Sequence, residues 1–176
     1  AAVTTFEEIS AASLATLVVT DEYDSSDADT RELVLNLDDT TSLTSVDATG
    51  AQGGTDITID GLADGANINL VQSDDASADA TDNLTITFVG DTGADDVTIT
   101  VGDAAHTITI TNGDLDDLVI NAGDGIDTVN LTGAQGDNIE INLGAGADVV
   151  TGSNDDDEID LGAADTDTDH INIENE

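Results

Sequence analysis

Short apolar segments recur along the chain at a nearly constant interval. From residue 84 onward, segments with alternating apolar residues return every ten or eleven residues, separated by loops rich in Gly and Asp. Counted in alternate steps, the interval is close to 21. One series is Val97, Leu118, Ile139 and Ile159, and the other is Ile108, Val129, Val150 and Ile171. A fixed period of this length is typical of stacked structural repeats.

The residue types at these positions indicate how the strands are arranged. In a parallel β-solenoid, residues one turn apart stack on each other, so apolar triplets should recur at the period. Such triplets are Val97/Ile99/Val101, Leu118/Ile120/Ala122, Ile139/Ile141/Leu143 and Ile159/Leu161/Ala163. We therefore predict an all-β protein, a parallel β-solenoid or β-roll with turns of about 21 residues. An antiparallel sandwich, which also has short, regularly spaced strands, is the alternative.

The same rhythm extends toward the N-terminus with an interruption. Leu35, Val46, Ile57 and Ile68 are evenly spaced at about half the longer period, and the polar segment after Leu70 breaks the pattern. We predict one solenoid over residues 31–176, with an insertion loop near residues 72–83.

Residues 1–30 precede the repeats and are predicted to form an N-terminal cap or arm with a linker. Thr5–Glu8 has a capping-box pattern, which predicts a short helix through Ala15. The β-branched run Thr16–Thr20 predicts a strand.

Charge restricts the possible partners. The 176 residues contain one Arg, no Lys and 40 Asp plus Glu, a formal net charge of −39. Nucleic acid is not expected as a partner, and an anionic membrane surface is disfavoured, because binding to either requires basic side chains. A folded chain of this charge needs neutralising ions, and carboxylate and carbonyl oxygens suit calcium. The sequence therefore predicts a protein that binds several Ca²⁺ ions.

Location is predicted from the same facts. The sequence has no Cys, so no disulfide stabilises it, and no apolar stretch is long enough for direct membrane insertion. Calcium is abundant outside cells, which favours a secreted, extracellular or cell-surface protein. The first residue is Ala1 and no Met is present, which indicates a processed product or a segment of something longer.

Several loops match a calcium-binding nonapeptide of the form G-G-x-G-x-D-x-U-x, in which U is a large apolar residue. Segments 122–130 and 143–151 lack only the first Gly, and segment 90–98 lacks only the second. Weaker copies are segments 112–118 and 152–159. Gly permits the backbone conformations that turn carbonyls toward one point, and Asp adds a short oxygen ligand. The simpler alternative is that these are ordinary turns, which favour the same residues.

On these motifs, residues 90–170 resemble the RTX family of calcium-binding β-rolls in exported bacterial proteins. The resemblance implies calcium held between successive turns by Asp carboxylates and glycine-loop carbonyls. The long period departs from a turn built of two nonapeptides, and several loops lack a Gly. The candidate metal-site residues are Asp95, Asp116, Asp127, Asp137, Asp148 and Asp157, with Gly93, Gly123, Gly125, Gly144 and Gly146.

The sequence gives little support for catalysis or for a regular threonine surface. His106 and His170 are the only imidazoles, and nothing places a nucleophile or further ligands beside them, so we predict that the protein is not an enzyme. Thr-x-Thr strands suggest a regular Thr surface. However, Val119 and Asn121 come one turn after Thr98 and Thr100, so we interpret these Thr residues as solvent-facing strand formers.

Three functions fit these features. The first is a structural subunit of a bacterial surface layer, filament or matrix, which associates with itself into a homopolymer or lattice, with cell-surface polysaccharide as a further partner. The second is a calcium-binding repeat module of a large adhesin. The third is the C-terminal RTX carrier segment of an exported hydrolase.

Overall fold

A computed structural model describes residues 3–10, 12–20, 32–38, 42–50, 54–60, 63, 65–69, 81–87, 96–103, 105–111, 116–132, 134–136, 138–153, 157–162 and 168–172. These residues form strands and no helix. The strands are β1 (Val3–Ser10), β2 (Thr16–Thr20), β3 (Glu32–Asp38), β4 (Ser45–Gly50), β5 (Gly54–Asp60), β6 (Asn67–Asn69), β7 (Thr81–Thr87), β8 (Thr98–Thr100), β9 (Ala105–Thr111), β10 (Val119–Asn121), β11 (Thr128–Asn130), β12 (Ile139–Asn142), β13 (Val149–Thr151), β14 (Asp157–Asp160) and β15 (His170–Asn172).

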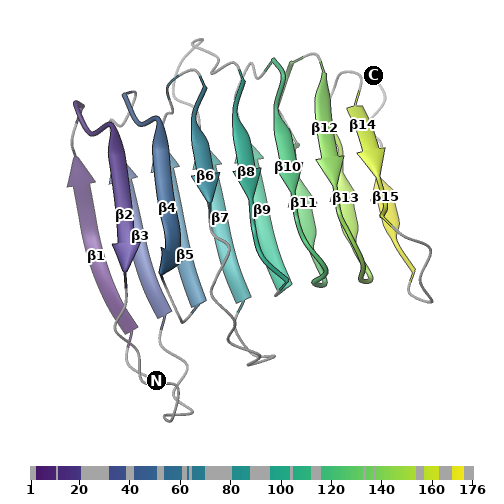
Figure 1. Ribbon diagram of the computed structural model, residues 1–176, viewed down its shortest axis with the longest axis horizontal. Helices are drawn as coiled ribbons and strands as arrows, with labels where there is room; N and C mark the ends of the chain where they lie inside the picture. Colours follow the sequence, from purple (N-terminus) through teal and green to yellow (C-terminus); the bar gives the residue numbers. More distant parts are fainter. Residues whose placement is uncertain are drawn as a thin grey trace.

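The strands form two parallel sheets that face each other (Figure 1). Sheet A contains the odd-numbered strands from β1 to β15 in sequence order, and sheet B contains the even-numbered strands from β2 to β14. Each turn of the chain, or rung, therefore adds one strand to each sheet. This is the predicted parallel β-solenoid, and the parallel pairing excludes the antiparallel sandwich.

The predicted 21-residue period is confirmed in the second half of the chain. In sheet B, Thr98 pairs with Val119, which pairs with Glu140. In sheet A, residues 107, 128, 149 and 170 are paired in turn. The earlier stacking is confirmed too, because Leu35 pairs with Ile57 and Val46 pairs with Ile68.

The predicted stacking is wrong at the last rung of sheet B. Ile159 pairs with Ile141, and Asp157 pairs with Ile139, so this rung is shorter than those before it. The sequence series placed Ile159 on Ile139, which is two positions out of register. Such a shift leaves the same side chains facing inward, because successive strand residues alternate between faces. The apolar pattern therefore does not distinguish the two registers.

The predicted N-terminal helix is also wrong. Residues 3–10 form β1, and Phe6 pairs with Leu35 at the edge of sheet A. The register is irregular between Phe6 and Ile9. The open edge of β3 outweighs the local capping pattern, because pairing satisfies a row of backbone groups at once. The predicted strand at Thr16–Thr20 is confirmed as β2, which pairs with β4.

Most of the predicted insertion loop near residues 72–83 lies outside the described residues. Its last part, 81–83, belongs to β7.

The core is a thin aliphatic layer between the sheets. Ile99, Ile120 and Ile141 stack on one wall and are fully buried. Ile108 and Val129 stack on the opposite wall. Every buried apolar side chain that the structure places in this core is Ala, Val, Leu or Ile. Very short strands such as β8 and β10 can still hold this core, because every rung covers its neighbours.

One corner of the solenoid is built from residues with left-handed backbone conformation. Asp96, Asp117 and Asn138 have φ values of 59°, 57° and 63°, and each directly precedes a buried core residue of sheet B. Asp and Asn adopt this conformation more readily than other residues with a side chain. The acidic residues at this corner therefore have a structural use that needs no metal.

The burial of Ile120 in the core can be tested by substitution. Replacing the buried Ile120 by Val is expected to lower the free energy of unfolding by about 1 kcal/mol, because one buried methylene is lost. The same change at Ile126, which is 64% exposed, is the matched control and should stay within about 0.5 kcal/mol of the parent protein. Urea denaturation at fixed calcium concentration measures both. Equal losses would mean that β10 does not face the core.

Candidate functional site

A column of polar residues crosses the starts of the sheet A strands. His106 is the second residue of β9. Asp127 directly precedes β11, Asp148 precedes β13, and Asp169 precedes β15. The four residues follow one another at the repeat period. His106, Asp127 and Asp148 are almost completely buried, at 2%, 1% and 0% exposure. Buried Asp is rare in proteins unless its charge is compensated, so this acidic column is the foremost candidate site.

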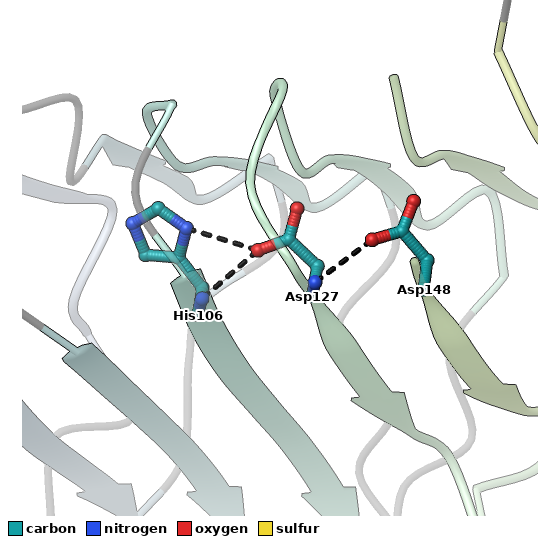
Figure 2. Close-up of polar contacts among 3 residues, drawn as sticks. All are labelled: His106, Asp127 and Asp148. Carbon is teal, nitrogen blue, oxygen red and sulfur yellow. Dashed lines mark hydrogen bonds and ion pairs between the residues drawn. The ribbon is translucent and has the colours of Figure 1, made fainter. Parts of the chain in front are cut away.

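Backbone hydrogen bonds link the members of the acidic column. The backbone N–H of Asp127 donates to Oδ1 of Asp148 at 2.8 Å, and the N–H of Asp148 donates to Oδ1 of Asp169 at 3.2 Å. The N–H of His106 donates to Oδ1 of Asp127 at 2.9 Å. Figure 2 shows the row formed by His106, Asp127 and Asp148. Each carboxylate thus satisfies a backbone N–H group of the rung before it.

His106 occupies the place that Asp has in the following rungs. Its ring Nδ1 lies 3.2 Å from Oδ1 of Asp127, the oxygen that also accepts its backbone N–H (Figure 2). The other oxygen, Oδ2 of Asp127, is buried and has no hydrogen-bond partner among the described residues. A buried carboxylate oxygen without a partner is costly, and a cation bound at this atom would remove that cost.

Glycines line the loops that lead from sheet B into this column. Gly123, Gly144 and Gly162 have φ values of 88°, 85° and 80°. A Cβ atom at these positions would lie 2.1 Å from the carbonyl oxygen of Gly102, 1.8 Å from that of Gly123 and 1.7 Å from that of Gly144, respectively. Only Gly fits such spacing. The rungs therefore stack their glycine carbonyls in a continuous line.

A second glycine line runs beside the acidic column. A Cβ atom at Gly146 would lie 1.7 Å from the carbonyl oxygen of Gly125 and 3.1 Å from Oδ1 of Asp148. The carbonyl oxygen of Gly125 and the carboxylate oxygen Oδ1 of Asp148, which belong to neighbouring rungs, thus both lie close to Gly146. The loops also bring carboxylates to the first glycine line, with Oδ1 of Asp103 and of Asp124 each 3.3 Å from the corresponding Cβ positions at Gly123 and Gly144.

These oxygens have the chemistry that calcium requires, because its ligands are carboxylates and carbonyls. The described residues contain no group of three or more His, Cys, Asp or Glu side chains placed to hold a metal. An ion at this edge would therefore depend on backbone carbonyls for much of its coordination. The unpartnered Oδ2 of Asp127 and the adjacent carbonyl lines fit that requirement.

The structure brings together six of the candidate residues named from the sequence. Asp127 and Asp148 lie in the acidic column, and the two glycine lines beside it contain Gly123, Gly125, Gly144 and Gly146. Gly93, Asp95 and Asp137 lie outside the described residues.

Two candidates belong elsewhere. Asp116 lies in an exposed turn that leads from sheet A to sheet B, whereas the acidic column follows the loops that lead from sheet B to sheet A. Because the strands of the two sheets run in opposite directions, these turns lie at opposite edges. Asp157 belongs to β14, and its carboxylate accepts hydrogen bonds from the backbone N–H and hydroxyl of Ser153 at 2.9 and 2.8 Å. These hydrogen bonds stabilise the turn between Ser153 and Asp157.

Sequence reasoning did not find the role of His106. The signal was present, because His106 lies exactly one period before Asp127, in the series that continues through Asp148. Gly162 was missed for another reason. It follows Gly144 sooner than the regular period predicts, in step with the shortened last rung.

Comparisons with known proteins give no further identification. No protein-family model, no curated protein and no solved structure matches this chain. The described residues include no helix with the length and hydropathy needed to cross a membrane.

Proposed function

We propose that the chain is a structural extracellular protein, a calcium-stabilised β-solenoid subunit of a bacterial surface layer, filament or matrix. The observation that carries this proposal is the buried acidic column of Asp127 and Asp148 beside the stacked glycine carbonyls. The resemblance of the Gly/Asp loops to RTX repeats supports the same chemistry. On this proposal, several Ca²⁺ ions lie between successive rungs at this edge.

The charges of the chain support a need for cations. The formal net charge is −39, and adjacent strands place like charges opposite each other, as Glu140 of β12 pairs in register with Glu158 of β14. Directly opposed like charges destabilise a sheet. Asp127 and Asp148 add two buried carboxylates on neighbouring rungs. Folding and metal binding are therefore expected to be coupled.

The architecture supports a structural role. Strand pairing continues through both sheets from the first described rung to the last, and each rung contacts only its neighbours. Solenoids of this kind serve as extended scaffolds, and their end strands carry unpaired backbone groups that can join another chain. The proposed partners are further copies of the same chain, with cell-surface polysaccharide as an attachment point.

Calcium titration of metal-stripped protein tests the proposal. We expect calcium to increase the β signal in far-UV circular dichroism and to produce large particles in light scattering. Magnesium at equal concentration is the matched control and should act less, because it demands octahedral geometry and retains water. A β spectrum unaffected by chelation would overturn the metal assignment and leave the loops as turns.

The same experiment distinguishes the alternatives. A β transition without particle growth would favour the repeat module of an adhesin or the carrier segment of an exported hydrolase. If assembled material keeps its size distribution in EDTA, calcium does not bridge the subunits.

A further inference from the structure

We propose that the outer surface of sheet A, from β9 to β15, is the face through which two copies of this chain pair. We name it the threonine face. It consists of Thr107, Thr109, Thr111, Thr128, Asn130, Val149, Thr151, His170 and Asn172. The inference deepens the proposed function, on which it rests, because it names the surface that a self-assembling subunit would use.

The first argument is charge. No residue of the threonine face is acidic, although 40 of the 176 residues of the chain are Asp or Glu. The outer face of sheet B has carboxylates on its last two strands, with Glu140 on β12 and Glu158 and Asp160 on β14. Asp116 and Asp124 are exposed in the turns. Two strongly acidic copies repel each other least where their contact contains no carboxylate.

The second argument is shape. The strands of the threonine face pair without a register irregularity, so their outward residues form straight columns. One column runs through Thr107, Thr128 and Val149, and the next through Thr109, Asn130 and Thr151. The backbone pairing continues in register onto β7, where Thr85 pairs with Thr109. A parallel sheet with such columns offers a regular surface for packing against a second sheet.

The third argument is chemistry. The outward residues of β9, β11 and β13 are half-buried, and their alternating neighbours are in the core. Thr and Asn both donate and accept hydrogen bonds, so a face built from them is complementary to an identical face. Thr and Val also bring methyl groups that gain from burial. Neutral sugars are a weaker match, since this face has neither a Phe, Tyr or Trp side chain nor a carboxylate to hold their hydroxyls.

The area sets the strength of pairing. With strands about 4.8 Å apart and two or three outward residues on each, the face covers roughly 300–400 Å². A stable interface needs about 800 Å² from each partner, so one pair of faces is weak. Weak contacts become durable when several act together, as they would in a lattice or filament. The threonine face alone therefore pairs two copies weakly, and further contacts would be added only in a larger assembly.

Sedimentation equilibrium of the calcium-loaded full chain tests the pairing. At calcium concentrations that fold the chain but do not yet give large particles, the mass of wild-type protein is expected to rise toward twice the monomer mass as its concentration approaches about 1 mM, the range of a small interface. The double variant T109E/T128E should remain a monomer, because it opposes carboxylates across the contact. The matched control T98E/T100E adds the same charge at half-buried Thr residues on sheet B and should associate like wild type.

Three outcomes would overturn the proposal. They are a monomeric wild type, equal association of T109E/T128E and wild type, and loss of association in T98E/T100E alone. A monomeric wild type that binds a neutral polysaccharide, with binding lost in T109E/T128E, would assign the face to a glycan instead. Far-UV circular dichroism of every sample separates this failure from failure of calcium-dependent folding.

A second measurement covers a variant that fails to fold. The chain has no Cys, so a spin label on T109C reports a single site. Dipolar coupling between copies labelled at residue 109, and none between copies labelled through T100C, is the expected result. Coupling at residue 100 alone would overturn the pairing.

Discussion

Replacing Gly144 by Ala is expected to lower the free energy of unfolding by about 5 kcal/mol or to prevent folding. Two effects add. An added Cβ would lie 1.8 Å from the carbonyl oxygen of Gly123, and the φ of 85° is itself unfavourable for Ala by about 1–2 kcal/mol. The carbonyl belongs to the backbone of the neighbouring rung, so it cannot move without disturbing both sheets.

Gly65 provides the matched control for Gly144. Its φ is 69°, and a Cβ at this position would meet no atom within 4 Å. Gly65→Ala should therefore show only the conformational cost of about 1–2 kcal/mol. Urea denaturation followed by circular dichroism compares the two variants. Similar losses in both would show that close stacking of the glycine loops does not hold in solution.

Replacing Asp127 by Asn is expected to have opposite effects with and without calcium. Without calcium, the change removes one of two buried carboxylates on neighbouring rungs. The Asn oxygen can still accept hydrogen bonds from the backbone N–H of His106 and from an Nδ1–H of its ring, so the variant should be more stable than wild type. With calcium, the variant lacks a charged ligand, and we expect the calcium concentration at half-maximal folding to rise about 10-fold or more. The two stability curves should therefore cross as calcium is added.

Asp117→Asn is the matched control for this experiment. Asp117 is exposed and has a positive φ, and Asn already occupies the corresponding position, residue 138, one rung later. It changes the net charge by the same amount without touching the acidic column. Urea denaturation across a calcium series gives the curves. Parallel curves for Asp127→Asn and wild type would contradict a calcium ligand at Asp127.

Periodicity predicted the architecture because stacked positions share one environment. Ile120 must be apolar for the same reason as Ile99 and Ile141, its partners in the adjacent rungs. The repeat interval therefore predicted both the positions of the strands and their order in the sheets. It failed where the interval changed, because Ile159 pairs with Ile141 and not with Ile139. An apolar pattern with period two is the same in both registers.

The candidate site was predicted in part for a related reason. The motif located Asp127 and Asp148 with their glycines, because a fixed loop geometry requires those residue types. The role of His106 was not predicted, because it depends on Asp127 in the next rung and not on its neighbours in sequence. The helix predicted near Thr5 failed likewise, because local capping signals contain no information about the sheet edge at β3.

The exact repetition between β8 and β13 has a consequence for how such a chain can change in length. Any cut in one turn can be rejoined at the equivalent place in the next, with both sheets still in register. Deleting or duplicating one whole repeat therefore preserves every strand pair on either side. An insertion of a single residue within a strand would instead turn core residues outward. Outside its loops the molecule can thus lengthen or shorten only by whole rungs, and unequal recombination between repeats is the genetic event that produces such steps.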